Sequence, residues 1–315
     1  MISDINEISK NLQEFFSINE LQCVSDNSHS YYLKEIKVDN ILNEVFKICS
    51  LNEYCFSIFR DKFAQIKVII FDKYENDSIE FLFYTIDPNE ILLDEQTKYT
   101  KRVNFLRKLK ILPVIGPDGA GKTTLLTQVI KELNQKIFYK RFKKIVRRSI
   151  IYNIVQPINK YFLTKKLGRK PEKDQHDDIH YLLIIFAGLG YYPYLFFQSL
   201  FKKNIIILDR FFYDYLLKDI SFMEKNTCLR KNWKFLLKFI PQSYWIIHLD
   251  ANAEIILSRK EELSFDDIEK YRELNFMLYL NKPSVVYSYI NTGLEIERCK
   301  NILLKTGRKS KVFND

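Results

Sequence analysis

Residues 116–124 read Gly-Pro-Asp-Gly-Ala-Gly-Lys-Thr-Thr and hold three of the chain's eight glycines. From Gly116 to Thr123 the run matches the G-x-x-x-x-G-K-[ST] pattern of a phosphate-binding loop. Glycines without Cβ atoms let such a loop curl, so that its backbone N–H groups point at phosphate oxygens. An apolar run at 111–115 precedes the loop, and apolar residues at helical spacing follow over 125–133. This strand–loop–helix order aims a helix N-terminus at the phosphates and predicts a nucleotide site.

The loop residues have expected roles in binding ATP and Mg²⁺. Lys122 can reach the β and γ phosphates, and the Thr123 hydroxyl can hold Mg²⁺. A chance glycine-rich turn is the alternative. Pro113, in the apolar run before the loop, indicates a bulge or a short strand because proline cannot donate to a sheet. The predicted nucleotide-binding residues are Gly116, Asp118, Gly119, Ala120, Gly121, Lys122, Thr123 and Thr124.

From residue 109 onward, short apolar runs alternate with long helical stretches, which is typical of an α/β fold with a parallel sheet. The predicted strands are 111–115, 204–208, 244–249 and a last one near 285–290. Residues 181–201 are uncharged and long enough to cross a bilayer. Because Gly188, Gly190 and Pro193 cluster in their middle, a buried, kinked helix is the favoured interpretation. A membrane span and shallow membrane contact are the alternatives.

The first hundred residues differ in charge from the residues after them. They carry 9 Lys/Arg and 18 Asp/Glu, whereas residues 101–173 carry 20 and 3. This contrast predicts a boundary near residue 100. We expect a small α+β domain of unknown role at 1–100, a larger domain at 109–306 and a tail at 307–315. Within the small domain we expect a helix over 41–48, strands at 54–59, 66–71 and 79–86, and a hairpin turn at 75–78.

The basic run at 140–148 has several interpretations. It can face nucleic acid, an anionic membrane, a phosphorylated substrate or the acidic N-terminal region, or it can be a solvated helix face. The five cysteines are scattered and form no C-x-x-C pair, which indicates free thiols in a reducing compartment. No secretory signal pattern opens the sequence, so a cytoplasmic location is expected.

Two further groups of residues follow predicted strands. Asp209-Arg210 comes after 204–208, where a carboxylate can hold the Mg²⁺ shell beside Thr123 and a guanidinium can clamp a phosphate. A structural ion pair is the alternative. Arg259-Lys260 comes after the strand ending at Asp250 and can close over a transferring phosphoryl group. A solvated helix is its alternative. The predicted catalytic residues are Lys122, Arg210 and Arg259, and the predicted metal-binding residues are Thr123 and Asp209.

These motifs, in this order, resemble thymidylate kinase-like P-loop kinases over about residues 109–306. The nearest resemblance is to a bacterial subgroup associated with surface polysaccharides, through Asp209-Arg210-Phe211-Phe212-Tyr213-Asp214 and Arg259-Lys260-Glu261-Glu262-Leu263-Ser264. The resemblance implies a doubly wound parallel sheet of the P-loop NTPase type and phosphoryl transfer that depends on ATP and Mg²⁺. It also implies that Asp118 faces the acceptor.

The acceptor is left open by the sequence. Thymidylate kinases carry Ala-Asp-Arg on the helix before the Asp-Arg strand, whereas Ala187 is followed here by Gly188-Leu189-Gly190. The expected acceptor is a small molecule, either a nucleoside monophosphate or a sugar-like or lipid-linked hydroxyl. The alternative functions are a regulatory nucleotide switch and, less favoured, a nucleic-acid-binding module. Peripheral membrane contact and a homodimer are further expectations.

Overall fold

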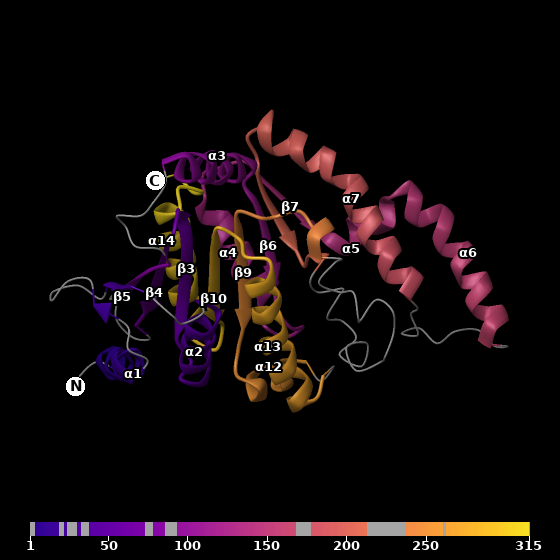
Figure 1. Ribbon diagram of the computed structural model, residues 1–315. Coiled ribbons are helices and arrows are strands. Elements are labelled where there is room, and N and C mark those ends of the chain that lie inside the picture. Colours follow the sequence, from indigo (N-terminus) through magenta and orange to yellow (C-terminus); the bar gives the residue numbers. More distant parts are fainter. Residues whose placement is uncertain are drawn as a thin grey trace.

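The computed structural model describes residues 4–18, 22–23, 30–32, 38–72, 78–85, 93–167, 178–212, 237–260 and 263–314. These residues form an α/β fold around one mixed sheet of ten strands, in the order β1-β2-β5-β4-β3-β10-β9-β6-β8-β7 (Figure 1). Several positions in the predicted motifs and turns lie outside the described residues: 75–77, Tyr213, Asp214, Cys228, Glu261 and Glu262.

Half of the sheet is parallel, as the alternating pattern predicted. Pro113 lies in β6 without a shift of register, and the pairing of β6 with β9 begins only after it, at Val114. The central strands are nearly all buried, so their apolar runs face helices on both sides. The parallel strands are β6 (Ile111–Ile115), β7 (Ile137–Arg141), β8 (Ile205–Asp209), β9 (Trp245–Asp250) and β10 (Val286–Asn291).

The N-terminal strands extend the same sheet. Strand β3 pairs antiparallel with β10, and β4 and β5 follow in an antiparallel meander. The boundary predicted near residue 100 falls inside helix α3 (Leu93–Leu109), and one hydrophobic core runs through both parts. Backbone pairing explains this continuity, because β3 satisfies the N–H and C=O groups that β10 would otherwise present at the edge of the sheet. These strands are β1 (Gln22–Cys23), β2 (Ser30–Tyr32), β3 (Cys55–Lys62), β4 (Gln65–Phe71) and β5 (Ser78–Tyr84).

Helices cover both faces of the sheet. Adjacent strand residues point to opposite faces, and Phe56 and Ser57 of β3 show the two sides. The Phe56 ring contacts Phe46 of α2 and Phe276 of α13, whereas the Ser57 hydroxyl lies 3.3 Å from that of Thr306 on α14. Besides α3, the helices are α1 (Asp4–Ile18), α2 (Val38–Leu51), α4 (Lys122–Glu132), α5 (Phe142–Arg148), α6 (Ile150–Leu167), α7 (Asp178–Leu200), α12 (Ala253–Arg259), α13 (Phe265–Asn281) and α14 (Ile296–Lys309).

The described residues near the C-terminus pack against the sheet and its helices. Helix α14 runs to Lys309, and Val312 and Phe313 are buried. The Phe313 ring lies 5.5 Å from that of Trp245, and a Cβ on Gly307 would come within 1.9 Å of Phe313. Within the expected tail at 307–315, Val312 and Phe313 therefore form part of the core, because burying a large aromatic ring removes much apolar surface from water.

Helix α7 coincides with the apolar stretch at 181–201 and leads into β8, as expected. Its burial is not as expected: Phe186, Tyr194, Phe197 and Leu200 are exposed. Together with α6 it forms a pair of helices that extends beyond the β7 edge of the sheet (Figure 1). Among the described residues, no helix is both long and apolar enough to cross a membrane. The three cysteines whose thiols are described, Cys49, Cys55 and Cys299, are free and buried.

Candidate functional site

The glycine-rich loop joins the carboxyl end of β6 to α4. Gly116 has φ +135° and Gly121 has φ +65°, both in the region that L side chains rarely adopt. A Cβ on Gly116 would lie 1.9 Å from the backbone oxygen of Leu249 in β9. Glycine at position 116 therefore lets the loop leave the sheet at this point, next to the neighbouring strand.

Lys122 lies at the start of α4 and folds back over the loop. Its Nζ donates to the backbone oxygen of Gly116 at 2.8 Å and to that of Pro117 at 2.5 Å. The side chain is buried, whereas Thr123 and Thr124, next along the helix, are exposed. The ammonium group is therefore fixed inside the loop, and two hydroxyl groups of the first helical turn are open to a ligand.

Asp118, at the tip of the loop, gathers three cations. Its carboxylate forms an ion pair with Arg210, and lies 4.0 Å from Lys122 Nζ and 3.8 Å from Lys260 Nζ. Burial acts to raise the pKa of Asp118, but Arg210, Lys122 and Lys260 outweigh it and lower that pKa. The cations come from three different segments, and they converge on one anionic point beside the loop.

Arg210 has an unusual backbone. It follows β8 with φ +68°, a left-handed conformation that is uncommon for a residue with a side chain. Its backbone N–H donates to the oxygen of Val114 in β6 at 2.9 Å. Such strain collects at functional sites, and here it accompanies a guanidinium group that points at Asp118.

Asp209, predicted to bind metal, has partners that the sequence did not reveal. Its Oδ2 accepts from the Tyr139 hydroxyl at 2.9 Å and from Arg141 Nε at 3.1 Å. Among the described residues, no three His, Cys, Asp or Glu side chains lie close enough together to hold a metal ion by themselves. Mg²⁺ in nucleotide sites takes one or two protein oxygens and completes its shell with phosphates and water, so the hydroxyl of Thr123 and the carboxylate of Asp209 have suitable chemistry.

Arg259 lies at the end of α12, beside the glycine-rich loop. Its guanidinium donates to the backbone oxygens of Gly119 at 3.4 Å and Thr292 at 3.3 Å. It thereby spans the loop and the turn after β10. A cavity of about 390 Å³ opens here, lined by Gly121, Thr124, Leu125, Arg259, Thr292, Leu294, Ile296 and Cys299. Lys260, not Arg259, contacts Asp118.

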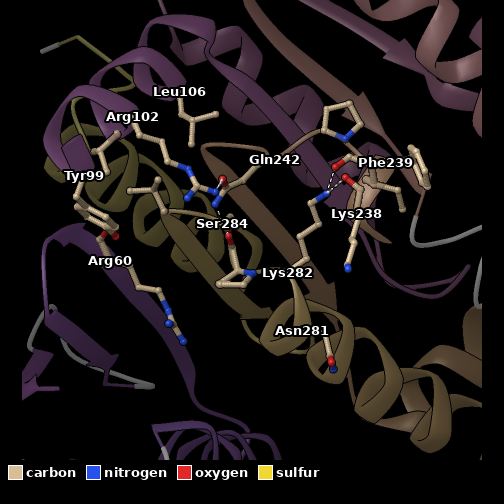
Figure 2. Close-up of a pocket in the computed structure, with 15 residues that line it drawn as sticks. Arg60, Tyr99, Arg102, Leu106, Lys238, Phe239, Gln242, Asn281, Lys282 and Ser284 are labelled. Atoms are coloured by element: carbon tan, nitrogen blue, oxygen red, sulfur yellow. Dashed lines mark hydrogen bonds between the residues drawn. The ribbon is translucent and has the colours of Figure 1, made fainter. Parts of the chain in front are cut away.

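A second cavity, of about 580 Å³, lies at the opposite ends of the parallel strands from the glycine-rich loop, beside the amino ends of β9 and β10. Figure 2 shows Arg102 beside Gln242 and Ser284, and Lys282 pointing at backbone oxygens near Lys238. Burial, with a contribution from Arg102, lowers the pKa of Lys282 to about 8. Lys282 thus binds backbone oxygens of the neighbouring segment 237–240, at the amino ends of β9 and β10 and away from the glycine-rich loop.

His248, on β9, is buried behind the loop. Its Nδ1 lies 2.7 Å from the Tyr287 hydroxyl, and its Nε2 has no hydrogen-bond partner within the described part of the chain. Burial lowers the pKa of His248 from 6.5 to about 3, and the charges of Arg272 and Lys122 add to the effect. The folded protein therefore holds this imidazole neutral.

The histidine predicts a pH-dependent stability. Below pH 6.5 the unfolded chain protonates His248 and the folded protein does not, so stability present above pH 6.5 is lost as the pH falls toward 3. We expect the free energy of unfolding to fall by about 2 kcal/mol between pH 6.5 and pH 5 through this group. Urea titrations of the protein and of His248→Gln at both pH values measure it. An equal pH dependence in the two proteins would contradict the assignment.

The structure thus brings together Lys122, Asp118 and Arg210 and places Arg259 over the same loop. Sequence reasoning missed Tyr139 and Arg141 as partners of Asp209, although Arg141 stands in the basic run. It also missed the Thr292 hydroxyl, whose single proton is within hydrogen-bond distance of the backbone oxygens of Ala120 and Asp250, at 3.0 and 2.8 Å. No model of a known protein family matches this chain, and no curated protein matches it either.

Proposed function

We propose that the protein is an ATP-dependent kinase that transfers the γ-phosphoryl group to a small acceptor. The observation that carries the proposal is the convergence of Lys122, Arg210 and Lys260 on Asp118 beside the glycine-rich loop. Phosphoryl transfer needs positioned cations around the transferring group more than it needs a nucleophile from the protein. Three cations from three segments satisfy that need.

The strand order supports a doubly wound P-loop fold as the frame of this site. From β6 the chain moves to β7 and β8 on one side and then to β9 and β10 on the other. In open parallel sheets, ligands bind outside the carboxyl ends of the strands where the order reverses. The glycine-rich loop, Arg210 and Arg259 all follow the carboxyl ends of these strands.

Each residue has a role in this proposal. Lys122 and the loop N–H groups would hold the β and γ phosphates, and Thr123 and Asp209 would hold Mg²⁺ directly or through water. The nucleoside would occupy the 390 Å³ cavity that Arg259 lines. Asp118 keeps Arg210 and Lys260 in position on the acceptor side, where their charges would offset that of the transferring phosphoryl group.

The proposal predicts turnover that depends on an acceptor. We expect ADP release from ATP and Mg²⁺ to rise at least about tenfold when the right acceptor is supplied. A coupled ADP-release assay over nucleoside monophosphates, sugars and polyprenols measures it. If no acceptor stimulates turnover and Lys122→Met leaves ATP affinity unchanged, the protein is not this kind of kinase. Slow hydrolysis without any acceptor would instead indicate a nucleotide switch.

A further inference from the structure

Exposed apolar side chains are concentrated in one part of the molecule. Of the fifteen exposed large hydrophobic side chains among the described residues, ten lie between positions 150 and 201. Soluble surfaces carry such residues singly, and a cluster marks an interaction site. The ten are Ile150, Ile154, Ile158, Tyr161, Phe162, Phe186, Tyr194, Phe197, Leu200 and Phe201.

On α6 these side chains form a continuous stripe. Ile150, Ile154, Ile158, Tyr161 and Phe162 recur at intervals of three and four residues, and their exposed fractions run from 51% to 76%. Residues at this spacing lie on one face of a helix. A face turned to water is normally polar. We call these five residues the α6 stripe, and its exposure calls for a partner.

Basic residues accompany the stripe. Residues 140–167 contain nine Lys/Arg and no Asp or Glu. In helix α5, immediately before the stripe, every exposed side chain is basic. The exposed bases of α5 are Lys143, Lys144, Arg147 and Arg148.

We propose that α5 and the α6 stripe bind the surface of an anionic lipid membrane. A helix with an apolar face and Lys/Arg beside it lies in the interface between headgroups and acyl chains, with each base adding electrostatic attraction. A second copy of this surface would bring like charges together. Nucleic acid would engage the Lys and Arg side chains but leave the three isoleucines of the α6 stripe exposed. The membrane accounts for both features, and the inference does not depend on the proposed kinase activity.

The apolar part is tested by flotation of the full-length protein with vesicles of phosphatidylglycerol and phosphatidylcholine in equal amounts. We expect Ile154→Asp combined with Ile158→Asp to weaken binding at least about tenfold, because both side chains leave the acyl boundary. Leu51→Asp is the matched control, since Leu51 is 79% exposed on α2, and we expect less than about a twofold change. Circular dichroism melts check that each variant folds.

The electrostatic part is tested with the same vesicles. Arg147→Glu combined with Arg148→Glu should weaken binding at least about tenfold, whereas Lys47→Glu combined with Lys62→Glu, also exposed, should not. Vesicles of phosphatidylcholine alone should bind at least about tenfold more weakly. Three results would overturn the inference: no flotation, equal flotation of the wild-type protein and the Ile154→Asp, Ile158→Asp variant, or a dimer that Ile154→Asp dissociates. Retention of DNA or RNA lost only with the arginines would assign the surface to nucleic acid instead.

Discussion

Replacing Lys122 with methionine is expected to reduce phosphoryl transfer by about a hundredfold to a thousandfold, the usual cost of removing one preorganised electrostatic contact from a transition state. The Nζ already sits inside the loop, held by the oxygens of Gly116 and Pro117. In the proposed ATP complex, those N–H···O bonds would be exchanged for bonds to phosphate oxygens. Methionine keeps the unbranched apolar stem but removes the charge.

The measurement is the steady-state rate of ADP release with ATP and acceptor, together with ATP affinity by calorimetry. Lys131→Met is the matched control, because Lys131 is an exposed lysine on the same helix, α4. We expect it to keep kcat within about twofold. Equal activity in Lys122→Met and Lys131→Met would show that the loop lysine has no part in the reaction.

Gly116→Ala is expected to lower the free energy of unfolding by about 3 kcal/mol or more. The new Cβ would lie 1.9 Å from the backbone oxygen of Leu249, and φ +135° is strained for any residue with a side chain. To relieve this clash, β6 and β9 would have to separate, although they are paired only at Val114 and Ile115 of β6. A large effect on stability therefore accompanies the loss of the loop's shape.

The matched control lies in the same loop. Gly121→Ala carries a positive φ of +65°, but its Cβ would meet nothing closer than Arg259 Nη1 at 3.6 Å. Only the conformational strain remains, worth about 1–2 kcal/mol. Urea unfolding of both variants measures the difference. If the two variants lose equal stability, close contact with β9 is not what requires glycine at position 116.

Much of the parallel half of the sheet could be predicted from the sequence. The limits of β6 were predicted to the residue, and those of β8, β9 and β10 to within one, because long apolar runs between helices admit few interpretations. Strand β7 was missed. Its residues, Ile137–Arg141, form a half-buried edge strand whose last two residues, Lys140 and Arg141, begin the basic run 140–148, and charge rather than apolar pattern dominated that run.

Other features depend on contacts between distant segments. The antiparallel pairing of β3 with β10 joins residues more than two hundred positions apart, and no local pattern reports it. The same holds for the cluster at Asp118: its cations were each visible, but their common partner was not. Helix α7 was expected to be buried because its stretch is uncharged and the glycines and proline in its middle disfavour a membrane span, yet neither feature tells whether another element covers each face.

The most direct test of a nucleotide site in the glycine-rich loop is a crystal structure with Mg²⁺ and a non-hydrolysable ATP analogue. We expect the triphosphate inside residues 116–123, with Lys122 Nζ on its β and γ phosphates and the base in the cavity between Arg259 and Thr292. A triphosphate bound elsewhere, for instance between Arg102 and Lys282 in the cavity beside the amino ends of β9 and β10, would contradict the proposal.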